Sequence, residues 1–298
     1  MKSFCILEQG GNTNEALTLK KKKMFNTEFS DFYRLNWRDE NDPNAFIVAK
    51  GVSWSEGRSL LYEKVPENYE YYIFIDDDVD FHADSDIDIP QKIKSLLEEC
   101  RPIAATFYMP NAWHFTEMNL PEESFLSKKY FPIAGFDEIA IIFSKSFAEI
   151  MFPVPYHGEH RTTWYCEWVC HSTFPLKQMC FTEVWVTGAR SGGHTKLKTL
   201  RRHQPTEILY LFNRHIKNKS LALKQRSQIA QNNLAVFNRD IDKNEINFAL
   251  KDLKKVYNIY NIDWTIRDSI ASKLYFLRRP WNRFWWKVVR RLTGEYKH

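Results

Sequence analysis

The chain has 298 residues, 44% of them hydrophobic and 15% aromatic, which is enough for a sizeable core in one large or two small domains. Its net charge of +5 is uneven: eight Lys/Arg and two Asp/Glu between Asp268 and His298 give that segment +6 and leave −1 for the rest. We therefore expect no general nucleic-acid-binding surface and no nucleic-acid partner. We also expect neither a signal peptide nor a membrane span, because no apolar run approaches the ~20 residues that a span needs.

The cysteines are odd in number and irregularly spaced, at Cys5, Cys100, Cys166, Cys170 and Cys180. This pattern is typical of reduced thiols in a cytoplasmic protein rather than of a disulfide framework. Although Cys166, Cys170 and His171 are close in sequence, no second Cys/His pair with zinc spacing accompanies them. We therefore expect no zinc site.

Apolar runs alternate with helical segments and short polar loops over the first two thirds of the chain. We expect strands at 3–7, 45–49, 71–75, 102–108, 133–144 and 179–187, and helices at 14–25, 55–64, 90–100, 146–151 and 164–173. We expect loops at 10–12, 39–44, 153–163 and 188–195. This order predicts an α/β fold with a mostly parallel sheet flanked by helices. The lysine run 20–23 is interpreted as a solvated helix face, with contact to anionic lipid as the alternative.

The most informative stretch is residues 71–81, where five apolar or aromatic residues lead directly into Asp76, Asp77 and Asp78. A continuous apolar run is typical of a strand buried in a parallel sheet, and ligands of such sheets bind beyond the carboxyl ends of the strands. Like charges placed together need a cation, and a hard divalent ion such as Mg²⁺ or Mn²⁺ prefers carboxylate and phosphate oxygens. The ordinary alternative is a solvated acidic turn.

The order of motifs resembles that of metal-dependent glycosyltransferases of the GT-A fold, over roughly residues 3–200. The resemblance implies that Asp76, Asp77 and Asp78 are the aspartate motif, with Asp76 and Asp78 at the metal. It further implies that His194 is the C-terminal metal ligand. The acidic cluster extends to Asp80, so a register of Asp78 with Asp80 stays open.

The same resemblance implies that Glu167 is the general base of an inverting transfer, because it follows Trp164 and Tyr165 at the start of a predicted helix. The family motif has two adjacent acids, whereas Trp168 follows Glu167 here. Asp137 and Glu138, in a segment similar to the family's acceptor loop, therefore remain rival candidates. A carboxylate in a partly desolvated cleft has a raised pKa, which suits it to take a proton near neutral pH.

The resemblance implies a nucleotide-diphosphate sugar as donor. Arg58 is a candidate for binding its phosphates, because guanidinium binds phosphate bidentately. Gly193 would let the backbone beside His194 approach the diphosphate, and Lys196 would screen its charge. An imidazole ligand would favour Mn²⁺ over Mg²⁺. In the alternative interpretation, Arg58 and Lys196 are ordinary surface residues and His194 is a loop histidine.

From residue 205 onwards, apolar residues recur at mostly helical spacing, so we expect a domain at 1–203 and a helical region at 204–298. Its last helix carries Arg279, Arg283 and Lys287 opposite Trp281 and Trp285, which is typical of an interfacial membrane helix. We therefore expect an anionic membrane surface as a partner, a glycan or lipid-linked acceptor, and a peripheral location on the cytoplasmic face of a membrane. The alternative is a helix that packs on the protein itself.

Two other function classes use some of the same features. A nucleotidyltransferase or metal-dependent phosphohydrolase would share the acidic cluster. The segment after the first predicted strand, Glu8-Gln9-Gly10-Gly11-Asn12, however lacks the Arg or Lys typical of a nucleotidyltransferase loop. A non-enzymatic membrane adaptor would depend on the basic tail alone. We favour the glycosyltransferase.

Overall fold

The computed structural model describes residues 2–11, 14–52, 54–66, 68–110, 126–133, 139–153 and 178–188. Its helices are α1 (Glu15–Phe25), α2 (Trp54–Lys64), α3 (Ile89–Cys100) and α6 (Lys145–Met151). Its strands are β1 (Lys2–Gly10), β2 (Ser30–Asn36), β3 (Ile47–Val48), β4 (Tyr69–Asp76), β5 (Val79–His82), β6 (Ala104–Tyr108), β7 (Tyr130–Pro132), β8 (Ala140–Ser144) and β9 (Gln178–Gly188).

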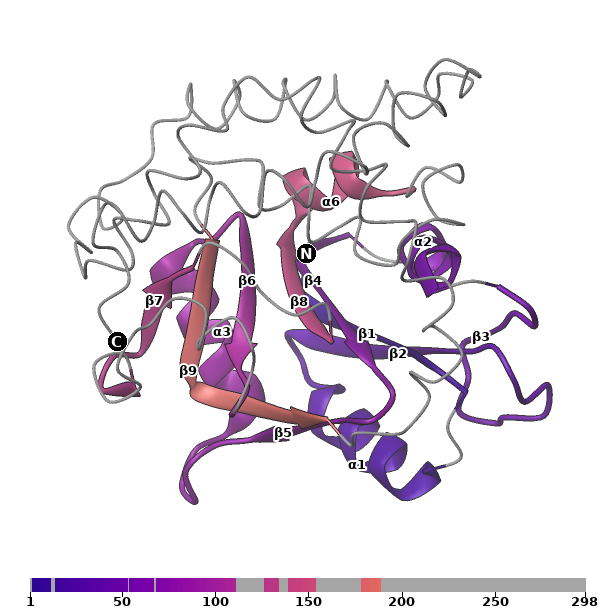
Figure 1. Cartoon of the computed structure of the whole chain (residues 1–298), viewed down its shortest axis with the longest axis horizontal. Helices are drawn as coiled ribbons and strands as arrows, with labels where there is room; N and C mark the ends of the chain where they lie inside the picture. The colour runs from indigo at the N-terminus through magenta and orange to yellow at the C-terminus, as the bar shows by residue number, and fades with distance from the viewer. Residues whose placement is uncertain are drawn as a thin grey trace, which may run out of the picture.

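In the described ranges the strands form a nine-stranded sheet in the order β3-β2-β1-β4-β8-β6-β9-β5, with β7 paired to β9 (Figure 1). Strands β3, β2, β1 and β4 are parallel neighbours, and β6 is parallel to β9. Strand β8 lies antiparallel between β4 and β6, and β5 and β7 are antiparallel to β9. Six strands thus point in one direction, which confirms the predicted α/β fold with a mostly parallel sheet.

Helices cover both faces of the sheet, and each face has its own apolar core. Side chains of α2 and α6, such as Leu61 and Phe147, share one core with Phe74 of β4. Side chains of α1 and α3, such as Phe25, share the other core with Ile75, the next residue of β4. Figure 1 shows α2 and α6 on one side of the sheet and α1 on the other. Because successive strand residues point to opposite faces, the apolar run of β4 supplies both cores.

Most of the predicted elements in this part of the chain are present. Helix α3 begins where the sequence indicates, because Asp88 caps it by accepting from the Gln91 amide at 2.9 Å and Pro90 lies in its first turn. It ends at Arg101, whose φ of 46° is left-handed. The strand predicted at 133–144 differs: of its described residues, 140–144 form β8.

Strands β2, β5 and β7 were not predicted from the sequence. In β2, buried and partly exposed residues alternate over the first four positions. The strand contains two charged residues, Asp31 and Arg34, and Arg34 is buried. A search for alternating apolar residues therefore misses this strand, because one of its buried positions holds Arg34. That arginine is buried only because it pairs with Glu8 of β1.

Several predictions lie outside the described residues: the helix at 164–173, the loop at 153–163 apart from its first residue, and the region 204–298. Among the helices that the structure describes, none is both long and apolar enough to cross a membrane. The described cysteines, Cys5, Cys100 and Cys180, are buried and form no disulfide bond with one another.

Candidate functional site

The candidate site is an acidic turn, which we define as Asp76, Asp77 and Asp78, between β4 and β5. The carboxyl ends of three parallel strands meet there: in register, Gln9 of β1 is the partner of Asp76 in β4, and Gly10 is the partner of Asn36 in β2. The three residues before Asp76 are fully buried. The turn thus lies at the sheet edge where α/β folds bind ligands, as the sequence predicts.

Helix α2 holds the first carboxylate of the acidic turn. Oδ1 of Asp76 accepts from Nε1 of Trp54 at 3.0 Å and from Nη2 of Arg58 at 3.2 Å. The Arg58 guanidinium is buried and stacks 3.6 Å from the centroid of the Trp54 ring. The interpretation of Arg58 as an ordinary surface residue is therefore wrong, while its contact with a donor phosphate stays a prediction.

The acidic turn holds negative charge that its surroundings do not fully compensate. Burial, together with the charges of Asp76 and Asp77, raises the pKa of Asp78 to about 6. Burial also raises the pKa of Asp76 above its ordinary value, although Arg58 and Trp54 oppose the change. A divalent cation bound by carboxylate oxygens would relieve this repulsion, so the donor set fits Mg²⁺ or Mn²⁺.

The described residues do not supply a complete metal site, since no three His, Cys, Asp or Glu side chains among them converge on one point. The alternative register with Asp80 has a different environment: Asp80 is in β5 and pairs with Lys20 of α1 at 2.7 Å. Asp76 and Asp78 therefore remain the predicted ligands. The other predicted site residues lie outside the described ranges: Asp137, Glu138, Glu167, Gly193, His194 and Lys196.

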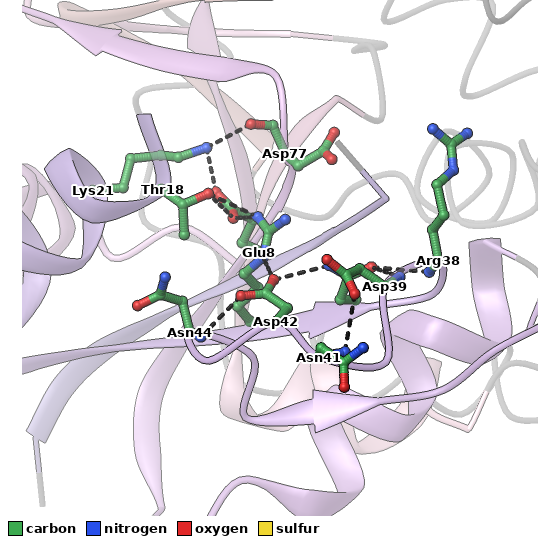
Figure 2. Close-up of polar contacts among 11 residues, drawn as sticks. Glu8, Thr18, Lys21, Arg38, Asp39, Asn41, Asp42, Asn44 and Asp77 are labelled. Carbon is green, nitrogen blue, oxygen red and sulfur yellow. Dashed lines mark hydrogen bonds and ion pairs between the residues drawn. The ribbon is translucent and has the colours of Figure 1, made fainter. Parts of the chain in front are cut away.

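A buried charge network lies beneath the turn and was not predicted from the sequence (Figure 2). Glu8 of β1 is fully buried and forms ion pairs with Lys21 of α1 and Arg34 of β2. Arg34 also donates from Nε to Asp42 at 2.9 Å, in the loop after β2. Lys21 donates from Nζ to the carbonyl oxygen of Asp77 at 2.9 Å.

The interpretation of lysines 20–23 as a solvated face is wrong for Lys21, which is fully buried. The helical period could have identified it, because Thr18, Lys21 and Phe25 lie on one face of α1 and are its buried residues. A lysine at an inward position indicates a buried acidic partner. That partner, Glu8, follows the apolar residues Phe4 to Leu7 of β1, and no sequence period marks it as a buried acid.

A buried amide next to the turn was also missed. Gln9 is fully buried, and neither its Nε2 nor its Oε1 has a hydrogen-bond partner within the described part of the chain. A Cβ atom at Gly57 of α2 would lie 2.7 Å from Oε1 of Gln9, so this helix packs closely over the amide. The glycine of α2 therefore allows Arg58 and its neighbours to approach the strand ends.

No family model and no curated protein matches the sequence. Among solved structures, the chain is similar to a crystal structure of GalNAc-T7 with UDP, GalNAc and Mn²⁺, at 10% identity and a TM-score of 0.52. This alignment covers 88% of the chain and 56% of that protein. The likeness shows that the two share a fold, which supports the predicted GT-A-like fold class, and the chain spans little more than half the length of GalNAc-T7.

Two further solved structures are also similar. A197 from STIV has 13% identity and a TM-score of 0.39, and the alignment covers 64% of the chain and 87% of that protein. A glycosyltransferase involved in the glycosylation of the major capsid of PBCV-1 has 16% identity and a TM-score of 0.30. Its alignment covers 50% of the chain and 62% of that protein.

Proposed function

We propose that this chain is a glycosyltransferase that moves a sugar from a nucleotide-diphosphate sugar to an acceptor hydroxyl, with a divalent metal ion. The observation that carries the proposal is the pair of carboxylates, Asp76 and Asp78, at the carboxyl end of a buried parallel strand beside Arg58. The fold shared with GalNAc-T7, whose structure contains UDP and Mn²⁺, supports a nucleotide donor and Mn²⁺.

In this proposal Asp76 and Asp78 hold the metal, with His194 as the third protein ligand. The ion, when bound, neutralises the charge that develops on the diphosphate as it leaves. Arg58 is buried against Trp54, so it acts mainly by orienting Asp76. Direct binding of donor phosphate by Arg58, Gly193 and Lys196 stays part of the proposal.

The transfer itself requires a base for the acceptor. As the acceptor oxygen attacks the anomeric carbon, the bond from that carbon to the diphosphate oxygen breaks, and the base takes the hydroxyl proton. Glu167 is the proposed base, with Asp137 or Glu138 as the rival. A single displacement of this kind inverts the anomeric centre, and the configuration of the product tests it.

The acceptor is proposed to be a glycan or a lipid-linked sugar at the cytoplasmic face of a membrane. The support is the charge of +6 between Asp268 and His298, together with the tryptophans among those cations. Sedimentation of the full chain with anionic phosphatidylserine vesicles tests this part. Binding that survives Arg283→Glu with Lys287→Glu would overturn the role of the basic helix.

Calorimetric titration of UDP, GDP, CDP and ADP, with and without Mn²⁺, tests the donor site. We expect one nucleotide to bind only with the metal, and Asp78→Asn to weaken that binding more than about tenfold. Asp80→Asn is the matched control, because Asp80 pairs with Lys20 outside the proposed ligand set. Absence of nucleotide binding by the wild-type chain would overturn the proposal. Turnover of a nucleoside triphosphate would favour the nucleotidyltransferase or phosphohydrolase instead.

A further inference from the structure

The middle residue of the acidic turn is held by α1. Nζ of Lys21 donates to the carbonyl oxygen of Asp77 at 2.9 Å, and the two residues are 56 positions apart in the sequence. The side chain of Lys21 is fully buried. Figure 2 shows Lys21 reaching between Asp77 on one side and Glu8 and Thr18 on the other. The position of the Asp77 peptide thus depends on a buried ammonium group.

Strand β1 restricts the same residue from another direction. A Cβ atom at Gly10 would lie 1.9 Å from Cγ and 2.3 Å from Cβ of Asp77. Real Cβ atoms essentially never approach another heavy atom within 3.0 Å, and moving the Cβ of Asp77 requires its backbone to move. Gly10 therefore permits close packing of the Asp77 side chain on the end of β1.

Lys21 is itself held in place by the buried network. Glu8 pairs with Lys21, and its other carboxylate oxygen pairs with Arg34. Thr18 of α1 donates to the same Glu8 oxygen at 3.3 Å. Arg34 is fixed in turn by Asp42 at 2.9 Å. Because each charge has a partner and a hydrogen bond, the lysine cannot rotate away without leaving a buried charge uncompensated.

The acidic turn is thus fixed from both faces of the sheet. Helix α2 binds Asp76 through Trp54 and Arg58, and helix α1 binds Asp77 through Lys21. Metal ions tolerate errors of only about 0.2 Å in ligand distance, so the direction of each carboxylate matters. A buried ammonium is a poor source of stability, because apolar residues often replace buried ion pairs without loss. Positioning of the turn explains Lys21 better.

We propose that Lys21 is a positioning residue for the divalent-metal site: by fixing the carbonyl of Asp77, it sets how Asp76 and Asp78 present their carboxylates. The inference rests on the proposed function, in that it takes these two residues as metal ligands. In this proposal Asp77 anchors the acidic turn to α1 through its carbonyl oxygen, and Glu8 orients the side chain of Lys21.

The test compares Lys21→Met with Lys20→Met, a matched control that removes the adjacent lysine, which pairs with Asp80 at the surface. The readouts are Mn²⁺ affinity, measured from the electron paramagnetic resonance signal of free Mn²⁺, and hydrogen exchange of the peptide that spans β4 to β5. We expect Lys21→Met to lower Mn²⁺ affinity about tenfold and to speed exchange in the turn, with Lys20→Met within about twofold of wild type.

Wild-type Mn²⁺ affinity together with unchanged exchange in a folded Lys21→Met chain would overturn the inference. If the wild-type chain binds no Mn²⁺, the proposed function fails, and the exchange data alone then decide whether Lys21 anchors the turn. If circular dichroism shows that Lys21→Met does not fold, Gly10→Ala takes its place, because it displaces Asp77 and keeps every buried charge. Wild-type Mn²⁺ affinity and exchange in that variant would likewise overturn the inference.

Discussion

Arg58 and Asp76 are joined by a hydrogen-bonded ion pair of 3.2 Å, with the guanidinium stacked on Trp54 at 3.6 Å from the ring centroid. The arginine is fully buried, whereas the side chain of Asp76 is 31% exposed. The pair therefore connects the buried face of α2 to the accessible edge of the sheet. Because the guanidinium of Arg58 is planar and an ammonium group is not, we expect that lysine cannot replace it.

Replacing Arg58 by lysine should lower the free energy of unfolding by about 1–3 kcal/mol, because an ammonium cannot both stack on Trp54 and donate to Asp76. Urea unfolding measures the change. Arg38→Lys, in the exposed loop after β2, is the control and should lie within about 0.5 kcal/mol of wild type. Equal midpoints for both variants would contradict the structural role of the stack.

The raised pKa of Asp78 predicts a pH-dependent gain in stability for Asp78→Asn. The folded chain keeps this proton up to about pH 6, whereas the ordinary value is 3.8. Between these values the folded state binds more protons than the unfolded state, so the free energy of unfolding falls as pH rises. Above pH 6 the variant, which has no charge there, should be about 1–2 kcal/mol more stable than wild type.

Thermal unfolding of both chains between pH 4.5 and pH 8, without metal, measures this difference. The gain should shrink towards pH 4.5, where wild-type Asp78 is protonated in the folded state. Asp80→Asn, which removes a charge that pairs with Lys20, should show no such gain. A difference between Asp78→Asn and wild type that is constant across the range would show that Asp78 does not titrate as described.

Glu8→Gln should destabilise the fold severely. The change removes the carboxylate between two buried cations, Lys21 and Arg34, and leaves them facing a neutral amide. Loss of one partner of a buried ion pair lowers the free energy of unfolding by about 3–5 kcal/mol. Glu40→Gln is the matched control, because its pair with Lys50 is exposed and is worth less than about 1 kcal/mol. Chemical unfolding of the two variants, side by side, gives the comparison.

Gln9→Met should stabilise the fold by about 1 kcal/mol, since the Gln9 amide is buried without a hydrogen-bond partner among the described residues. The same change at the exposed Gln91 of α3 should leave stability within about 0.5 kcal/mol of wild type. If the Gln9 amide serves a ligand, the more stable variant will bind nucleotide less tightly. A loss of stability in Gln9→Met would mean instead that the amide supports the folded chain.

Sequence patterns predicted the elements whose stabilisation is local or apolar. Pro90 predicted the start of α3, and the apolar run 71–75 predicted β4 with an acidic edge. Strand β2 was not predicted because Asp31 precedes its few apolar residues and Arg34 interrupts them. Burial of Arg34 is stabilised by Glu8, which lies 26 residues away. The spacing of apolar residues within β2 cannot indicate a partner so far away in the sequence.

The sequence by itself determined that a buried strand ends in three aspartates, because both properties belong to consecutive residues. Only the tertiary structure decided which side chains surround them: Arg58, 18 residues before Asp76, and Lys21, 56 residues before Asp77. The physical reason is that a charged side chain enters a protein interior only with a partner. Pairing depends on the parallel register of β1, β2 and β4, which brings distant residues to one edge of the sheet.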